Sequence, residues 1–119
     1  MSSAALFPGD VVLVEHIPQD NPYARKIRPA LLLSNSEFNQ SSLDVIVVPL
    51  TSQIRHEYPY QIIIDAASPH FKETGLKCPS AIKCGYIFAY PKNRIKSKLG
   101  YVSQAVLKNI IRVITSILA

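Results

Sequence analysis

The chain repeats one pattern along most of its length: short apolar runs, each ended by prolines, glycines or small polar residues. These runs occupy residues 11–14, 30–33, 45–50, 58–65 and 81–90. Short runs rich in Val, Ile and Tyr and bounded by breaker residues are typical of β-strands. The pattern therefore predicts five or more short strands. The predicted connecting segments are residues 18–29, 36–42, 66–77 and 92–98.

Two details refine this prediction. Residues 36–42 are polar and fit one turn of helix, whereas 18–29 contain three prolines and several charges and fit a long loop. Pro49 stands near the end of the third run. Because proline cannot donate to a strand ladder, it indicates an edge strand or a bulge there.

The apolar period changes near the C-terminus. Apolar residues now recur at helical spacing, at Val106, Ile110, Val113, Ile114 and Ile117. Ser103 is a suitable N-cap, so we expect one amphipathic helix of roughly four turns. Short strands closed by one helix predict a mainly β fold with α, in the form of a small, strongly bent barrel with the helix packed on it.

The length of 119 residues fits a single domain over 1–119. The net charge of +5 is unevenly spread. Residues 1–73 contain five Lys or Arg and eight Asp or Glu, whereas residues 74–119 contain eight Lys or Arg and no carboxylate side chain. This basic half favours a nucleic acid or an acidic protein as partner, and it is equally compatible with a well-solvated face.

The cysteines and the N-terminus bear on the compartment. Cys78 and Cys84 are too far apart along one strand to bridge, and no Cys/His cluster indicates a zinc site or another metal. Reduced thiols are typical of cytosolic proteins. Residues 1–8 lack the features of a signal peptide, and no apolar run is long enough to span a bilayer. We therefore expect a cytoplasmic protein that does not bind membranes and needs no cofactor.

Several stretches, in order, resemble the MazF/PemK family of toxins. They are Gly9-Asp10-Val11-Val12-Leu13-Val14, Arg28-Pro29-Ala30-Leu31-Leu32-Leu33-Ser34-Asn35, Val47-Val48-Pro49-Leu50-Thr51-Ser52 with Tyr58-Pro59-Tyr60 shortly after, and Gly75-Leu76 through Ser80 to Lys83-Cys84. Their order and spacing agree with the family over residues 9–118.

The resemblance implies an SH3-like barrel of the CcdB/MazF type, with five to seven strands and a C-terminal helix. It also implies a homodimer, an endoribonuclease activity on single-stranded RNA, and a cognate antitoxin with which the toxin binds DNA. Arg28 and Thr51 match the Arg and Thr regarded as catalytic in the family. The fold is shared with CcdB-type gyrase poisons, so fold alone does not identify the reaction.

Metal-independent cleavage of this kind uses the 2′-OH as nucleophile and leaves a 2′,3′-cyclic phosphate and a 5′-OH. The planar fork of a guanidinium matches the phosphate oxygens, so Arg28 suits charge stabilisation. The alternative for Arg28 is a surface ion pair. The hydroxyl of Thr51 suits contact with a phosphate oxygen or the 2′-OH, and the alternative is a strand residue that caps a turn.

A second set of residues is predicted to contact RNA: Arg25, Lys26, Ser52, Gln53, Arg55, His56, Lys83 and Tyr86. Lys83 would touch phosphate. Tyr86 would stack on a splayed base or, alternatively, pack inside the barrel. His56 is the histidine to test, because it lies just beyond Thr51 and histidine is the residue type best suited to proton transfer near neutral pH, although an exposed loop histidine looks the same in sequence. His16 and His70 have no supporting context.

The chain departs from the family at two places. Gly85 and Tyr86 stand where several members carry an acidic residue and Gln, and Asp20, Asn21 and Tyr23 replace a Glu-Gln pair before Arg28. The general acid and base are therefore not assigned. Two alternatives follow: a catalytically weak or inactive nucleic-acid-binding relative, and a CcdB-like poison of gyrase that has no affinity for RNA.

Overall fold

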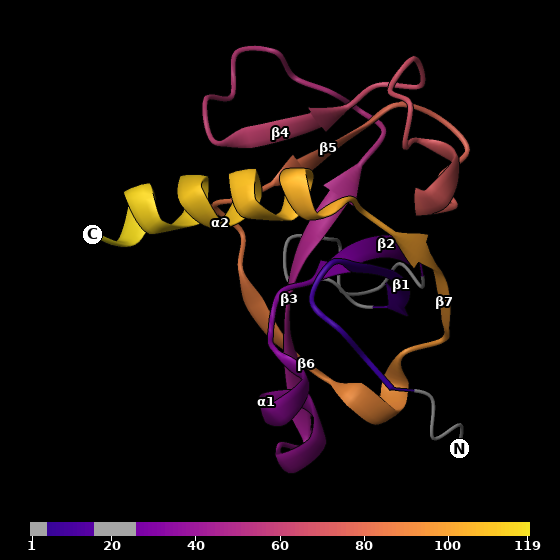
Figure 1. Ribbon diagram of the computed structural model, residues 1–119, viewed down its shortest axis with the longest axis vertical. Coiled ribbons are helices and arrows are strands. Elements are labelled where there is room, and N and C mark those ends of the chain that lie inside the picture. Colours follow the sequence, from indigo (N-terminus) through magenta and orange to yellow (C-terminus); the bar gives the residue numbers. More distant parts are fainter. Residues whose placement is uncertain (1–4, 16–25) are drawn as a thin grey trace.

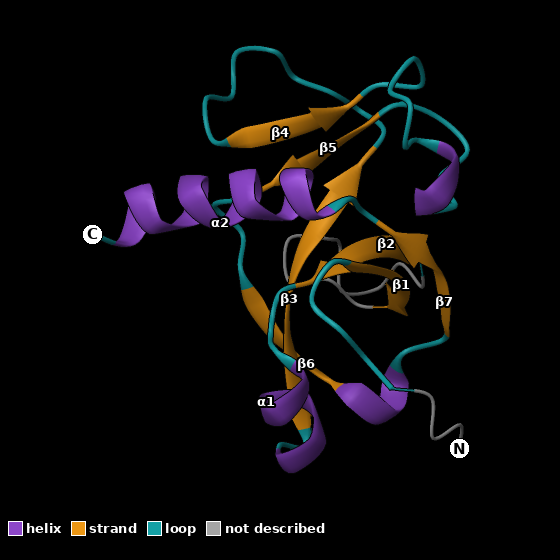
Figure 2. Ribbon diagram, in the orientation of Figure 1, coloured by secondary structure: helices purple, strands orange, loops and turns teal. Residues whose placement is uncertain are grey.

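The computed structural model describes residues 5–15 and 26–119. Within them the strands are β1 Asp10–Glu15, β2 Ile27–Leu32, β3 Asp44–Thr51, β4 Gln61–Ile64, β5 Ser80–Lys83, β6 Phe88–Pro91 and β7 Ser97–Tyr101. The helices are α1 Ser36–Ser41 and α2 Gln104–Leu118, with 3₁₀ turns η1 Lys72–Thr74 and η2 Lys92–Arg94. Figure 2 shows strands dominating and α2 as the long helix. The predicted mainly β fold with a C-terminal helix is confirmed.

The strands form one antiparallel sheet in the order β4-β5-β3-β2-β1-β7, and β6 pairs with β3 beside this path. β3 is therefore the central strand. On one side it pairs with β2, and on the other it pairs first with β6 and then with β5. The sheet bends around this strand, so β4 and β5 lie apart from β6 in Figure 1, which gives the half-barrel shape.

The predicted single strand over 81–90 is wrong, because it consists of β5 and β6 separated by an excursion. Val47 faces Phe88, and Leu50, three residues further along β3, faces Ile82, six residues away from Phe88. Three residues are therefore surplus. We call Gly85, Tyr86 and Ile87 the 85–87 excursion. A bond from the Tyr86 N–H to the Lys83 carbonyl, 3.1 Å long, closes the turn.

Pro49 lies beside this excursion. The Leu33 N–H donates to the Ile46 carbonyl at 2.8 Å, so strand alternation directs the nitrogen of Pro49 away from β2. The Pro49 nitrogen faces the break between β5 and β6, so the missing N–H of proline removes no hydrogen bond between strands. Of the two predicted alternatives, the edge strand is wrong, since β3 is central; an irregularity does occur beside Pro49, but it lies in the neighbouring strands β5 and β6.

Three other boundaries differ from the prediction. β2 begins at Ile27, inside the predicted loop 18–29, because pairing with β1 overrides the local breaker signal. The rest of that loop, up to residue 25, lies outside the described residues. β4 covers only Gln61–Ile64 of the predicted run 58–65. β7 was missed because its sequence SKLGY is an exposed, polar edge strand without apolar alternation.

The helices agree with the sequence. The Ser103 hydroxyl accepts from the Val106 N–H at 3.3 Å, which confirms the predicted N-cap of α2. Asn35 caps α1 in the same way through the Phe38 N–H. No described helix is long and apolar enough to cross a membrane.

The strands bury a different set of side chains on each face of the sheet. One cluster contains Leu31, Val48 and Ile82 and packs under α2, which contributes Ile110 and Ile114. The other contains the alternate strand residues and Tyr90, namely Val12, Val14, Ala30, Leu32, Val45, Val47 and Tyr90. The alternation identifies the face to which every strand residue belongs.

The basic C-terminal half is partly neutralised by carboxylates of β1. Lys96 lies 3.3 Å from Glu15, and Lys98 lies 3.1 Å from the buried Asp10. Asp10 also accepts from the Phe7 N–H at 2.9 Å. The charge asymmetry along the sequence is therefore smaller on the folded surface, because two of the basic residues face acidic partners.

Both cysteines are free thiols. Cys78 is exposed in the segment before β5, whereas Cys84 is buried directly before the 85–87 excursion. Burial raises the pKa of the Cys84 thiol to about 11. The two cysteines flank β5 without forming a disulfide.

Candidate active site

Arg28 and Thr51 lie just beyond the residues through which β2 pairs with β3. The register aligns Ala30 with Pro49, and continuing it by two residues places Arg28 across from Thr51. On the other side of β2, Arg28 faces Val14 of β1. Directly opposed residues of antiparallel strands point to the same face, with Cβ atoms about 4.5–5.5 Å apart. The paired residues end at Ala30 and Pro49, so it is by extension of this register that the two predicted catalytic residues share one face at neighbouring strand ends.

Lys83 belongs to the same face. Thr51 is aligned with Ala81 of β5, and Lys83 is two residues further along that strand. Residues two apart on a strand share a face, and a diagonal neighbour lies about 7–8 Å away. Gln61 of β4, which is aligned with Lys83, extends the row. This face of the sheet therefore carries two cations, on β2 and β5, with the Thr51 hydroxyl between them.

The Thr51 hydroxyl already has one partner. Its oxygen accepts from the Gln53 N–H at 3.1 Å, so Thr51 caps the turn that follows β3. This is the alternative that the sequence had left open for Thr51. The bond uses a lone pair of the oxygen and leaves the O–H able to donate. The turn thus orients the hydroxyl without preventing contact with a phosphate oxygen.

The loop after Thr51 is anchored at its far end. The Gln61 amide donates to the Arg55 carbonyl at 2.9 Å, and the Tyr58 N–H donates to the same oxygen at 3.1 Å. The Tyr60 carbonyl accepts from the Cys84 N–H at 3.0 Å, which joins the loop to the 85–87 excursion. Arg55 and His56 are exposed on this loop. The structure therefore leaves His56 as an exposed loop residue.

Three tyrosines and Lys83 form a compact group, which we call the tyrosine cluster: Tyr58, Tyr60, Tyr86 and Lys83. The ring centroids of Tyr58 and Tyr86 are 5.9 Å apart, and those of Tyr58 and Tyr60 are 6.1 Å apart. The Lys83 ammonium lies 4.5 Å from the Tyr86 ring centroid and 5.3 Å from that of Tyr58. Burial first, and then the adjacent Tyr86, raise the pKa of the Tyr58 hydroxyl, so it stays protonated at neutral pH.

A separate pocket of about 610 Å³ lies beside the start of β2 and the end of β3, and its lining includes Arg28 but neither Thr51 nor the tyrosine cluster. Its wall is mainly apolar and includes Leu13, Pro29, Leu50, Leu76 and Leu99. Polar and basic residues also line it, namely Lys26, Arg28, Ser52, Lys77, Cys78 and Ser80. An apolar pocket with basic residues suits a ligand that combines flat rings with phosphate.

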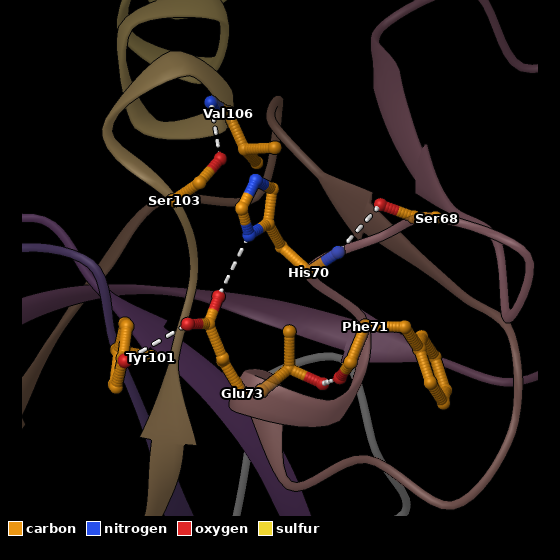
Figure 3. A network of polar contacts seen from close by, with 8 residues as sticks. Ser68, His70, Phe71, Glu73, Tyr101, Ser103 and Val106 are labelled. Atoms are coloured by element: carbon orange, nitrogen blue, oxygen red, sulfur yellow. Dashed lines mark hydrogen bonds and ion pairs between the residues drawn. The ribbon is translucent and has the colours of Figure 1, made fainter.

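A separate polar network joins η1 to β7. His70 Nδ1 lies 2.9 Å from one carboxylate oxygen of Glu73, and the Tyr101 hydroxyl donates to the other at 3.1 Å. Figure 3 shows this arrangement, with the capping bond of Ser103 beside it. The bond to Glu73 is the main cause of the raised pKa of Tyr101. His70 thus has a structural partner that the sequence did not indicate.

The predicted site residues fall into distinct groups. Arg28, Thr51 and Lys83 share a sheet face, and Tyr86 contacts Lys83. Lys26 and Ser52 join Arg28 at the pocket, while Gln53 contacts Thr51 through its backbone. Arg25, His16, Asp20, Asn21 and Tyr23 lie outside the described residues. Among residues 5–15 and 26–119, no three His, Cys, Asp or Glu side chains are grouped to hold a metal ion.

Comparison with known proteins identifies the family. The family model described as "PemK-like, MazF-like toxin of type II toxin-antitoxin system" matches residues 7–118. The chain belongs to this toxin family. The Endoribonuclease MazF of Staphylococcus saprophyticus is 31% identical over 103 residues, covering 86% of this chain and 82% of the relative. The Endoribonuclease MazF9 of Mycobacterium tuberculosis is 29% identical over 104 residues, covering 83% and 84%.

Solved structures of family members share the fold. MazF from Deinococcus radiodurans superimposes with a TM-score of 0.75 at 20% identity and covers 98% of each chain. A mycobacterial endoribonuclease solved in complex with its cognate antitoxin gives a TM-score of 0.72 at 23% identity, covering 96% of this chain and 95% of that one. The family resemblance and the predicted barrel are thereby confirmed. At these identities the structures show the fold alone.

Sequence reasoning missed Tyr58 and Tyr60 as candidate functional residues. The motif Tyr58-Pro59-Tyr60 had been read as the start of a strand, although Pro59 indicated that the strand begins later. Two tyrosines flanking a proline in a loop are a usable signal for exposed rings. Their partners Lys83 and Tyr86 are distant in sequence, and pairing of β4 with β5 brings them close.

Proposed function

We propose that this chain is the toxin of a type II toxin–antitoxin pair and that it cleaves single-stranded RNA without a metal ion. One observation supports the proposal: the register that aligns Ala30 with Pro49, extended by two residues, sets Arg28 and Thr51 on one sheet face, in a family whose members include named endoribonucleases. An arginine and a hydroxyl at fixed strand ends are suited to holding a phosphate group. Lys83 on the same face adds a second positive charge.

The reaction follows from the chemistry of RNA. The 2′-oxygen forms a bond to the adjacent phosphorus while the bond to the 5′-oxygen breaks, giving a 2′,3′-cyclic phosphate and a 5′-OH. The 2′-OH loses a proton and the leaving oxygen gains one. Arg28 holds the non-bridging oxygens as their negative charge grows, because its fork matches them. We assign it no proton transfer, because a guanidinium keeps its proton throughout the physiological pH range.

Thr51 and the surrounding residues position the RNA. With its oxygen held by the Gln53 N–H, the Thr51 hydroxyl donates to a phosphate oxygen or orients the 2′-OH. Lys26 and Ser52, which line the pocket with Arg28, contact the RNA strand on one side of Arg28. Arg55 and His56 are exposed on the loop that follows. Arg25 is proposed as a further RNA contact on sequence grounds.

The decisive experiment is cleavage of a long, defined RNA by the purified chain in excess EDTA. We expect cuts at defined sites, with 2′,3′-cyclic phosphate and 5′-OH ends, and we expect EDTA to have no effect. A single deoxyribose at the scissile position should block the cut at that site, because the nucleophile is missing. RNA that is retarded but never cut would favour an inactive relative, and RNA that is not bound at all would favour a protein-target poison.

We also propose that the chain forms a homodimer. Late turns of α2 leave Ile111, Ile117 and Leu118 exposed, and Leu118 is 74% accessible. Exposed apolar residues of this kind are commonly covered by a partner, and symmetric pairs are the commonest assemblies. Light scattering should report about twice the monomer mass of 13.2 kDa. A monomer at micromolar concentration would contradict this proposal.

The cognate antitoxin is proposed to bind the RNA-contacting surface. Solved family members include MazE–MazF complexes from Deinococcus radiodurans. Lys77 and Lys83 are basic residues near the pocket and the tyrosine cluster, and an acidic, partly disordered segment would fold against them. Adding the protein encoded beside this gene should abolish cleavage. If that protein and RNA bound together without mutual loss of affinity, they would not share a surface.

A further inference from the structure

The tyrosine cluster contains more than a phosphate contact requires. Its rings come from two places, the loop before β4 and the 85–87 excursion, and its lysine comes from the end of β5. Tyr60 is 47% exposed, and Tyr58 and Tyr86 are half-buried. The cleavage chemistry uses none of these rings. Flat aromatic rings that face solvent beside a lysine are the usual means of holding unstacked bases.

Gly85 makes the cluster possible. A Cβ atom at this position would lie 2.4 Å from the Tyr58 hydroxyl oxygen but 3.7 Å from the ring carbon that carries it. The overlap thus concerns the hydroxyl and not the ring. Gly85 is not among the glycines with positive φ, which are Gly9 and Gly75. Space for Tyr58, and not backbone conformation, is therefore what requires glycine at this position.

The position of the cluster relates it to the proposed cleavage site. Lys83 shares a sheet face with Thr51, as a diagonal neighbour about 7–8 Å away. Its ammonium is held over two rings, which restricts where it can bind a phosphate. An RNA strand that reaches Thr51 would therefore pass the tyrosine cluster with its adjacent nucleotide.

We infer that Tyr58, Tyr60, Tyr86 and Lys83 form a subsite for one unpaired nucleotide next to the scissile phosphate, and that Gly85 is the positioning residue that seats Tyr58. The base stacks on the rings and its phosphate binds Lys83. This inference rests on the proposed function and adds a reason for single-strand selectivity, because a base inside a duplex cannot reach the rings. It also accounts for Gly85 replacing the acidic residue of several family members.

The test uses the full chain and a short single-stranded RNA of random sequence that carries 2-aminopurine. Binding is followed by anisotropy, and stacking by quenching of the 2-aminopurine fluorescence. Tyr86→Ala and Tyr58→Ala should each weaken binding roughly 5- to 100-fold and reduce the quenching. Tyr101→Phe is the matched control, because Tyr101 belongs to the separate Glu73 network, and it should change neither signal.

The role of Gly85 is tested by a rescue. Gly85→Ala should lower affinity and quenching, Tyr58→Phe should change both little, and the double variant Gly85→Ala/Tyr58→Phe should recover most of the loss, because the overlapping oxygen is gone. Thermal melting of each variant separates loss of binding from loss of folding. If Gly85→Ala fails to fold, the Tyr58→Ala and Tyr86→Ala results decide.

The outcomes distinguish this inference from the proposed function. Undiminished binding and quenching in Tyr58→Ala and Tyr86→Ala would overturn the subsite, even in a chain that cuts RNA. Failure of the double variant to recover, when both single variants fold, would overturn the role of Gly85. Quenching that depends on the tyrosines in a chain that never cuts RNA would uphold the subsite while the proposed cleavage fails.

Discussion

Replacing Arg28 with alanine should slow RNA cleavage by about a hundred- to a thousand-fold, the usual cost of removing one donor that holds transition-state charge. RNA binding should fall much less, because Lys83 and the tyrosine cluster still hold the strand. Single-turnover cleavage and binding are measured in parallel. Cleavage by Arg28→Ala at nearly the original rate would remove Arg28 from the mechanism.

Matched variants sharpen this result. Arg28→Lys should rescue poorly, since an ammonium lacks the planar fork. Thr51→Ala should also slow cleavage, whereas Thr51→Ser should retain more activity because it keeps the hydroxyl that accepts from the Gln53 N–H. His56→Ala should matter less than either, because His56 is exposed on the loop. A large loss in His56→Ala would identify it as the unassigned acid or base.

Replacing Gly100 with alanine should destabilise the fold by about 3 kcal/mol or more, a large part of the stability of a small domain. A Cβ atom at Gly100 would lie 2.1 Å from the Glu73 carbonyl oxygen and 2.6 Å from the Thr74 carbonyl carbon. These are backbone atoms of η1, so the steric overlap can be removed only if η1 and β7 move apart. Gly75 meets Leu99 of β7 in the same way, at 2.3 Å from its carbonyl oxygen.

Urea unfolding measures this effect. Ser97→Ala, at an exposed position on the same strand, is the matched control and should change stability by no more than about 0.5 kcal/mol. Gly75→Ala should be at least as harmful as Gly100→Ala, since its φ of 73° also disfavours a side chain. A Gly100→Ala variant as stable as the Ser97→Ala control would mean that β7 and η1 are not in close contact.

The parts of the fold that bury apolar side chains were predictable. β1, β3 and α2 follow from apolar runs and helical spacing, because burial imposes a period on the sequence. β7 carries no such period, since an exposed edge strand is stabilised by backbone pairing with β1. The split of 81–90 into β5 and β6 was hidden for another reason. Both halves look like strands, and only their registers on β3 reveal the three surplus residues.

The candidate site was predictable in its residues but not in its arrangement. Arg28 and Thr51 were found through their family motifs, and their place on one sheet face follows only when the register of β2 on β3 is extended to them. Tyr58 was hidden in a run that resembled a strand. The contacts of Glu73 with His70 and Tyr101 join η1 to β7. Because β7 was not predicted from the sequence, these contacts could not be predicted either.

At the 85–87 excursion, a change of sequence does not change the register of a strand, whereas within a strand an inserted or deleted residue shifts the register. β5 and β6 each hold their own register on β3, so residues 85–87 can change in identity or number without shifting either strand. Arg28 and Thr51, by contrast, are themselves paired in the sheet, Arg28 with Val14 of β1 and Thr51 with Ala81 of β5. If the proposed nucleotide subsite is correct, substitutions, insertions or deletions at these three positions would alter nucleotide preference, while the groups proposed to break the phosphodiester bond stay where they are. The same three positions are the natural place to exchange specificity between relatives.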